Sequence, residues 1–189
     1  MQSPKILTLL FVQALVNHPH LNVMVPLFLI AIKPVTMKQT KLHPLLAKDC
    51  LTVLSLSLCD VFLMNDCQYP WLILVPDRPG LRDLDELTAE ETPLVYTEIQ
   101  QACRVLRRLF NPTKLNVAAL GNIVPQLHIH VIARFTTDPA WPKPIWGYHP
   151  PIIYPSDQLE DLLTRLRDSF GCHLSSTESH YEKFTARNH

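Results

Sequence analysis

The segment from Gln126 to Ile132 holds the polar residues whose types and spacing are best suited to chemistry. It reads Gln-Leu-His-Ile-His-Val-Ile, so polar and apolar residues alternate. Side chains alternate between the two faces of a β-strand, which predicts that Gln126, His128 and His130 project together. The side chains predicted on the opposite face are all apolar, namely Leu127, Ile129 and Val131. A row of imidazole and amide groups is unusual for a protein core, so this strand is a candidate site.

Three interpretations of the alternating segment compete. It can be the surface of a solvent-facing strand, a metal site that uses two histidines, or a histidine pair that binds or attacks phosphate. A metal site needs further ligands, and neither an H-E-x-x-H helix nor a cysteine cluster supplies them, although distant His or Asp residues can contribute. From periodicity alone the three interpretations stay open, and the solvent-facing strand is the default.

Glycine, cysteine and charge content restrict the other classes of protein. The 4 glycines are too widely spaced for a dinucleotide fingerprint, a P-loop or a nucleophile elbow. The 5 cysteines form no C-x-x-C pair, which favours reduced thiols and a cytoplasmic location over a disulfide framework. With 17 Lys+Arg against 17 Asp+Glu, the net charge gives no reason to expect nucleic acid or a membrane as a partner.

The chain of 189 residues fits one domain with appendages. Residues 1–36 contain two apolar runs, each shorter than the roughly 20 residues of a membrane-spanning helix. They can form an extra apolar element that docks on the domain, or an extension upstream of the natural domain. We favour the second interpretation, with Met37 as the natural start, because a polar stretch begins directly after it. The domain itself is predicted over residues 37–150, a C-terminal helix over 151–171 and a disordered polar tail over 172–189.

Two helices are predicted around the alternating segment. The stronger prediction runs from Thr88 to Phe110, because Thr88 and Glu91 have the spacing of a capping box and Asn111-Pro112 follows. The last helix is predicted to begin at Ser156 and to stop at Gly171.

Apolar, β-prone runs and turn residues predict the remaining elements. A short helix is expected where Pro44 can occupy a first turn. The short helix is placed at Leu42 to Lys48, and the four strands at Cys59 to Asn65, Trp71 to Val75, Lys114 to Leu120 and Gln126 to Arg134.

Two stretches of the chain resemble the histidine triad (HIT) family of nucleotide hydrolases and transferases. They are Lys114 to Arg134 (KLNVAALGNIVPQLHIHVIAR) and Phe62 to Pro76 (FLMNDCQYPWLILVP). The signature of the family is His-φ-His-φ-His-φ-φ, where φ is apolar, with a glycine and a polar residue upstream, here Gly121 and Asn122. Gln126 stands where the family usually has its first histidine. The resemblance covers roughly residues 42–147 and is closest to a bacterial branch of diadenosine polyphosphate hydrolase-like proteins.

The resemblance implies a fold and an oligomeric state. The fold is α+β, an antiparallel sheet of about five strands with a long helix packed across it and a C-terminal helix. Such domains usually form homodimers by pairing two sheets edge to edge, which would also cover an exposed strand edge. No metal and no other cofactor is implied.

The resemblance also implies an activity, hydrolysis at the α-phosphate of dinucleoside polyphosphates or nucleotide conjugates. His128 matches the family's nucleophile, which forms a covalent nucleotidyl intermediate and whose other ring nitrogen must keep its proton, for example by donating to a backbone carbonyl. His130 would donate to a phosphate oxygen. The further nucleotide- or phosphate-binding candidates are Gln126, Asn122, the N–H groups around Gly121, Asn65 at the ribose and, as a looser match, Asn116.

Two departures from the family pattern affect this expectation. Gln126 cannot donate a proton as an imidazole does. This loss matters less for a polyphosphate leaving group, which is already a stable anion, than for an amine. Trp71 stands where many members carry a histidine. Nucleotidyl transfer, and a nucleotide-binding module with weak catalysis, therefore remain as alternatives to hydrolysis.

Overall fold

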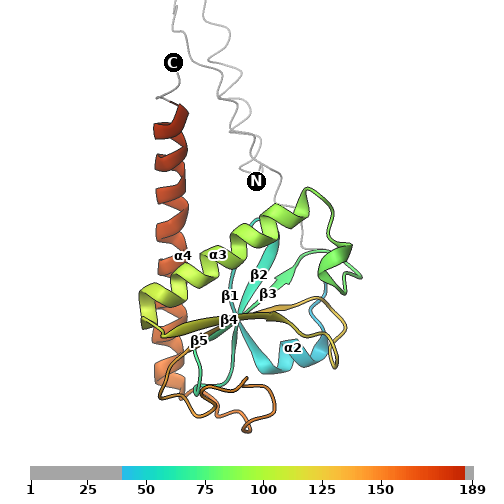
Figure 1. Ribbon diagram of the computed structural model, residues 1–189, viewed down its shortest axis with the longest axis vertical. Helices are drawn as coiled ribbons and strands as arrows, with labels where there is room; N and C mark the ends of the chain where they lie inside the picture. Colours follow the sequence, from blue (N-terminus) through green and yellow to red (C-terminus); the bar gives the residue numbers. More distant parts are fainter. Residues whose placement is uncertain (1–39, 186–189) are drawn as a thin grey trace, which may run out of the picture. The chain divides into compact units, whose positions relative to one another are not determined.

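The structure is a computed structural model that describes residues 40–185, with side chains described through residue 171. Its centre is an antiparallel sheet in the order β1-β2-β3-β5-β4 (Figure 1). The strands are β1 (Cys50–Ser55), β2 (Cys59–Met64), β3 (Trp71–Pro76), β4 (Lys114–Ala119) and β5 (Ile129–Arg134). The helices are α2 (Pro44–Asp49), α3 (Glu91–Phe110) and α4 (Ser156–Thr185), with the 3-10 helix η1 (Leu84–Glu86) before α3. This arrangement confirms the expected α+β fold.

Different elements cover the two faces of the sheet. On β3, Leu72 and Leu74 pack with apolar residues of α3 and α4 in one core. Trp71, Ile73 and Val75 pack on the other face, in a second core that includes Leu46 of α2. Figure 1 shows α3 lying across the sheet. Because both faces are buried, β3 is an uninterrupted apolar run rather than an alternating strand.

Strand β5 is also buried along its whole length, between β3 and β4. Ile129, Val131 and Ala133 join the core beneath α3 and α4, as the alternation predicted for the first two. The intervening residues therefore face α2, and among them His130 lies opposite Ile73 of β3 and Ala118 of β4. The sheet thus holds this histidine from both sides.

Helix α3 begins at Glu91, three residues after the predicted start at Thr88, and ends at Phe110 as predicted. The backbone N–H of Thr88 donates to the Glu91 carboxylate at 2.9 Å, and the Glu91 N–H donates to the Thr88 hydroxyl at 3.2 Å. These reciprocal bonds are the capping box. At the other end Asn111 adopts a left-handed conformation with φ 47°, and Pro112 cannot continue the helix.

Two strand predictions need correction. Strand β1 was not predicted, because the turn that joins it to β2, residues 56–58, contains no Gly, Pro, Asn or Asp. The Glu98 carboxylate accepts the N–H groups of Leu58 and Cys59 there, each at 2.8 Å. Strand β5 begins at Ile129 rather than Gln126, so residues 126–128 lie in the connection that precedes it.

The end of the last helix was also predicted wrongly. Helix α4 continues through Gly171 to Thr185. Gly171 does not adopt the left-handed backbone that ends helices, and glycine inside a helix costs only about 1 kcal/mol relative to alanine. The predicted tail over residues 172–189 is therefore helical as far as Thr185. The predicted extension over residues 1–36 and the last four residues of the tail lie outside the described residues. No helix in the described part is long and apolar enough to cross a membrane.

Candidate functional site

The ring of His128 is oriented by a backbone carbonyl. His128 lies one residue before β5 and is 5 % exposed. Its Nδ1 is 2.7 Å from the carbonyl oxygen of Gln126. A carbonyl oxygen can only accept, so Nδ1 carries the proton and donates. Nε2 of the neutral ring then carries the lone pair, which is the arrangement expected of a nucleophilic histidine.

His130 is held by a side chain rather than by the backbone. It is 5 % exposed, and its Nδ1 lies 3.1 Å from the indole Nε1 of Trp71. Burial, with a smaller contribution from His128, lowers the pKa of His130 to about 4. Loss of hydration disfavours the charged imidazolium, so this ring is neutral near pH 7.

Aromatic rings surround His130. The ring centroids of His128 and His130 are 4.9 Å apart, with an angle of 76° between the ring planes. Trp71 and Trp146 each lie 5.4 Å from His130, again measured between centroids. The Trp146 contact comes from the loop between β5 and α4. His130 is therefore packed against aromatic rings on the side of the sheet that faces α2.

A cavity of about 390 Å³ opens beside this pair, and we call it the histidine cavity. Its apolar wall comes from α2, the end of β2 and the β4–β5 loop, through Leu45, Leu46, Met64, Leu120, Ile123 and Val124. Its polar lining consists of Asp49, Asn122, His128 and His130, and the two tryptophans complete it. The cavity thus combines neutral hydrogen-bonding groups, one carboxylate and a surface suited to a flat apolar group.

Known proteins are similar to this chain in both sequence and fold. The HIT domain model matches residues 47–137. The crystal structure of a histidine triad protein from Bradyrhizobium japonicum is 39 % identical, covers 69 % of this chain and 97 % of its own, and superposes with a TM-score of 0.68. A histidine triad protein from Marinobacter aquaeolei VT8 is 43 % identical, with 69 % and 96 % of the two chains covered and the same TM-score. The chain belongs to the histidine triad family.

A third HIT structure, from Sinorhizobium meliloti 1021, is 37 % identical over 70 % of this chain and 98 % of its own, with a TM-score of 0.68. The HIT domain therefore accounts for most of the described residues. A comparison with curated proteins found no match.

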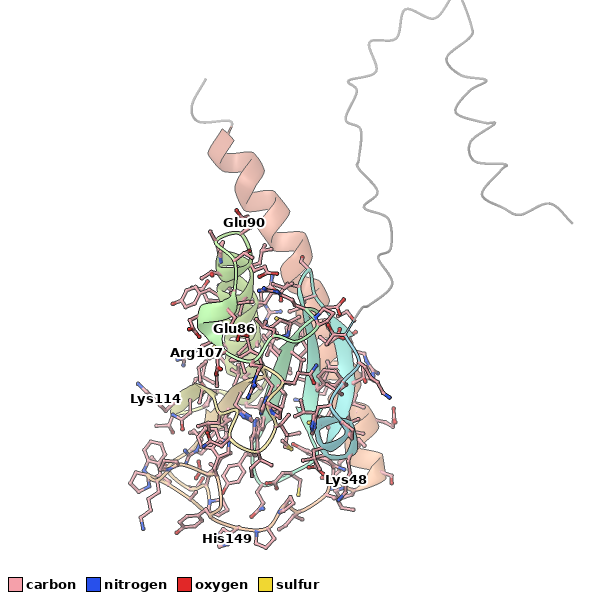
Figure 2. All side chains as sticks on the ribbon, turned by 90° about the vertical axis from the view of Figure 1, so that its right-hand side faces the viewer. Lys48, Glu86, Glu90, Arg107, Lys114 and His149 are labelled. Carbon is pink, nitrogen blue, oxygen red and sulfur yellow. The ribbon has the colours of Figure 1, made fainter. Side chains whose placement is uncertain are left out.

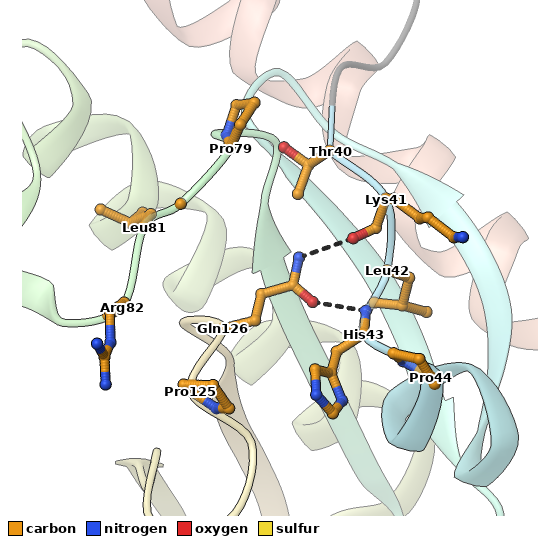
Figure 3. Close-up of a pocket in the computed structure, with 11 residues that line it drawn as sticks. Thr40, Lys41, Leu42, His43, Pro44, Pro79, Leu81, Arg82, Pro125 and Gln126 are labelled. Carbon is orange, nitrogen blue, oxygen red and sulfur yellow. Dashed lines mark hydrogen bonds between the residues drawn. The ribbon is translucent and has the colours of Figure 1, made fainter.

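Within the HIT domain, Gln126 does not join the two histidines. Its side-chain oxygen accepts from the His43 N–H at 2.8 Å, and its amide nitrogen donates to the Lys41 carbonyl at 3.4 Å (Figure 3). It lines a separate cavity of about 580 Å³ between residues 40–44 and 79–82. The strict alternation expected from residue 126 fails because β5 begins only at Ile129. The structure thus brings together two of the three predicted side chains.

The β4–β5 loop carries two further predicted site residues. Asn122 is exposed and lines the histidine cavity. Gly121 is also exposed but does not line it, although its neighbours Leu120 and Asn122 do. Gly121 needs no left-handed backbone, and a β-carbon added there would meet the Val124 carbonyl oxygen at an ordinary 3.6 Å. Its geometry therefore does not itself require glycine.

Asn65 lines another cavity of about 390 Å³, which shares a wall with the histidine cavity. The side-chain oxygen of Asn65 accepts from the Tyr154 N–H at 3.1 Å. Lys48 and His149, which also line this cavity, lie at the same end of the domain (Figure 2). The residues common to both cavities are Asp49, Met64, Trp71 and Trp146. Asn65 is therefore next to the histidine cavity but not in it.

Asn116 lies in a different cluster. Its side-chain oxygen accepts from Arg134 at 2.8 Å, and Arg134 also pairs with Asp138 at 2.7 Å. Both charged side chains are almost fully buried, at 2 % and 3 % exposed. Arg134 further donates to the Lys143 carbonyl at 2.9 Å, which ties the β5–α4 loop to the sheet. Asn116 thus supports the loop that carries Trp146 and does not line the histidine cavity.

Sequence reasoning missed several lining residues. Leu45, Leu46 and Asp49 belong to a six-residue helix with no motif of its own, so only the fold brings them to the histidines. Trp71 was noted as a departure from the family pattern, which was the one available signal. Among the described residues, no group of three or more His, Cys, Asp or Glu side chains is arranged to hold a metal ion.

Proposed function

We propose that this HIT protein is a nucleotide phosphohydrolase that works through a covalent intermediate on His128. The observation that carries the proposal is the 2.7 Å contact between His128 Nδ1 and the Gln126 carbonyl, which leaves the lone pair on Nε2. In the first step Nε2 bonds to the α-phosphorus, and the bond from phosphorus to the leaving oxygen breaks. In the second step water attacks the same phosphorus, the N–P bond breaks to restore the neutral ring, and the proton of the water is released to solvent.

Neutral donors beside His128 support attack at a phosphate. The amide of Asn122 lines the same cavity, as does the neutral ring of His130. Hydrogen bonds from fixed neutral groups stabilise the charge that grows on the non-bridging oxygens in the transition state. The nearby Asp49 carboxylate would repel phosphate, so we expect it to meet the hydroxyl groups of a ribose instead.

The apolar wall fits a nucleobase. Leu45, Leu46 and Ile123 provide aliphatic surface against which a flat ring can pack. Met64 adds a polarisable thioether. Asn65, in the adjoining cavity, has an amide nitrogen that can donate to the sugar, because its oxygen already accepts from Tyr154. These contacts support a nucleotide as the small-molecule substrate.

The position of Gln126 favours phosphoanhydride substrates. Its amide is bound to residues 41 and 43, so it neither donates a proton nor lines the histidine cavity. A polyphosphate leaves as a stable anion and needs no proton, whereas an amine does. We therefore propose dinucleoside polyphosphates as substrates in preference to nucleotide conjugates with amine leaving groups.

We further propose a homodimer formed through the edge of β4. The other edge strand, β1, is covered, because Arg167 of α4 donates to the carbonyls of Thr52 at 3.1 Å and Val53 at 2.9 Å. β4 lies at the opposite edge, and its Val117 is 47 % exposed. Sedimentation should show a dimer that Val117→Arg converts to monomer, while Thr52→Arg on β1 leaves the dimer intact. A monomeric parent protein contradicts the dimer.

A cytoplasmic location is the last part of the proposal. Cys50, Cys59, Cys67 and Cys103 are free thiols. Burial raises the pKa of Cys50 to about 12 and that of Cys59 still further, so both are inert as thiols. Four unpaired cysteines among the described residues support a reducing compartment.

The test is a rapid-quench experiment with diadenosine tetraphosphate labelled at its α-phosphates. We expect label on the protein within the first turnover, followed by release of labelled mononucleotide into water. His128→Ala should lose the adduct and lower the rate by on the order of a thousandfold or more. Binding without an adduct identifies a binding module, and an adduct that only a second phosphate resolves identifies a transferase. Either result overturns the hydrolase.

A further inference from the structure

Trp71 makes a buried hydrogen bond to a histidine of the site. It is the first residue of β3, which pairs directly with β5. Its Nε1 lies 3.1 Å from Nδ1 of His130, and the two residues are 9 % and 5 % exposed. Water therefore has little access to either atom, and the contact is stronger than the same contact on a surface.

The chemistry of the two partners determines where the proton of His130 lies. An indole N–H can only donate, so Nδ1 of His130 must accept and its proton must lie on Nε2. His128 is the reverse case, because its partner is a carbonyl oxygen that can only accept. The two neighbouring rings thus hold opposite tautomers, one with a lone pair on Nε2 and the other with an N–H on Nε2.

We propose that Trp71 is a positioning residue that fixes His130 in the Nε2–H tautomer. The inference rests on the proposed function, in which His128 bonds to phosphorus and His130 donates to a non-bridging oxygen. The other tautomer would bring a second lone pair toward the phosphate and repel it. A histidine at position 71 could donate or accept, whereas an indole allows only one arrangement.

The surroundings of His130 keep its ring uncharged, so that the tautomer of the ring is what can vary near pH 7. The titratable side chains that line the cavity with it are Asp49 and His128, and its aromatic neighbours Trp71 and Trp146 do not titrate. Burial keeps His130 neutral near pH 7. In a neutral ring the proton can occupy either nitrogen, and the hydrogen bond from Trp71 selects between them.

Trp146 provides a matched control within the same site. Its ring lies 5.4 Å from His130, the same centroid distance as that of Trp71. Its indole N–H is buried but has no hydrogen-bond partner in the described part of the chain. Trp146→Phe therefore removes an indole N–H and preserves an aromatic contact, without touching the bond to Nδ1 of His130.

The first test is nitrogen-15 NMR of the histidine rings in the full-length parent protein. We expect His130 to show a protonated Nε2 and an unprotonated Nδ1, and to stay neutral down to about pH 4. In Trp71→Phe, His130 should populate both tautomers and its pKa should rise, because its Nδ1 becomes free to accept a proton. Trp146→Phe should keep the parent tautomer. A proton on Nδ1 in the parent protein overturns the proposal without any variant having to fold.

The second test is the rate of adduct formation from diadenosine tetraphosphate. Trp71→Phe should lower the single-turnover rate by roughly tenfold to a hundredfold, with a smaller change in KM, because the lost contact acts in the transition state. An unchanged rate alongside a changed tautomer refutes the positioning role. If the parent protein forms no adduct, the proposed function fails, and NMR still decides the tautomer.

Discussion

His130 and Arg134 lie four residues apart on the same face of β5, and both are almost fully buried, at 5 % and 2 % exposed. Arg134 donates four hydrogen bonds, two to Asp138 and one each to Asn116 and the Lys143 carbonyl. His130 has one hydrogen bond in the described structure and borders a cavity. One strand therefore carries at its end a structural cluster with four of the five Arg134 donors bonded, and at its beginning a histidine with one ring nitrogen bonded.

The difference between Arg134 and His130 distinguishes a residue that stabilises the fold from one that serves the site. A buried charge is tolerated only when other groups of the protein satisfy it, so the partners of Arg134 are fixed by the needs of folding. A neutral imidazole costs less to bury and can keep one nitrogen for a ligand. Substitutions at the end of β5 should act on the unfolding free energy, and those at its beginning on the reaction rate.

Arg134→Met should give the largest loss of stability. It leaves the Asp138 carboxylate buried without its cation, which we expect to cost roughly 3–5 kcal/mol of unfolding free energy. Denaturant titration measures this loss, and the melting temperature should fall by about 10 °C. Arg134→Met combined with Asp138→Asn removes the stranded charge and should recover part of it. A single variant as stable as the parent protein refutes the structural role.

The same ion pair predicts a dependence on pH. Burial alone would raise the pKa of Asp138, but hydrogen bonds from Arg134 and from the Phe135 N–H outweigh it and lower the pKa. A lowered folded-state pKa stabilises the protein above the ordinary carboxyl range near 4 and ceases to do so as the carboxylate protonates at lower pH. The stability difference between the parent protein and Arg134→Met should therefore narrow below about pH 4. A constant difference down to pH 2 contradicts this assignment.

Gln126→Ala should have a mixed effect, because Gln126 connects the site to the segment at residues 41–43. Losing the bonds to His43 and Lys41 should cost about 1 kcal/mol of unfolding free energy. The carbonyl that orients His128 becomes less fixed, so we expect adduct formation to slow by about tenfold. Single-turnover kinetics and thermal unfolding measure the two effects. A loss of stability with no loss of rate would show that the carbonyl is held by other contacts.

Asn116→Ala should have the smallest effect on ligand binding. It removes one of the four hydrogen bonds of Arg134, which we expect to cost about 1–2 kcal/mol in unfolding free energy. Nucleotide affinity should stay within twofold of the parent value when measured by calorimetry, since Asn116 does not line the histidine cavity. A large loss of affinity would contradict this and would support the ligand-binding role that the family resemblance implied for Asn116.

Local patterns in the sequence predicted the features that neighbouring residues determine. The capping box of α3 joins Thr88 and Glu91, three residues apart, and both bonds are present. The alternation of apolar residues from Ile129 onward likewise predicted which side chains enter the core beneath α3. In both cases the neighbouring residues contain all the information needed.

The features that sequence reasoning missed depend on distant residues. The turn between β1 and β2 has no Gly, Pro, Asn or Asp to signal it, and its N–H groups are accepted by Glu98, about 40 positions away. The side chain of Gln126 is bonded to the backbone of His43 rather than placed beside the histidines. Trp71 and His130, which are hydrogen-bonded, are 59 residues apart in the sequence. The α4 prediction failed for another reason, because Gly171 is compatible with a helix as well as with its end.

The central claim is that Nε2 of His128 is the atom that bonds to phosphorus. The most direct measurement is the trapped nucleotidyl adduct of the parent protein, mapped to its residue by mass spectrometry and to its ring nitrogen by phosphorus-31 NMR. We expect a single adduct on His128, at Nε2, because Nδ1 is occupied by the Gln126 carbonyl at 2.7 Å. An adduct on His130, or on Nδ1 of His128, would contradict the account.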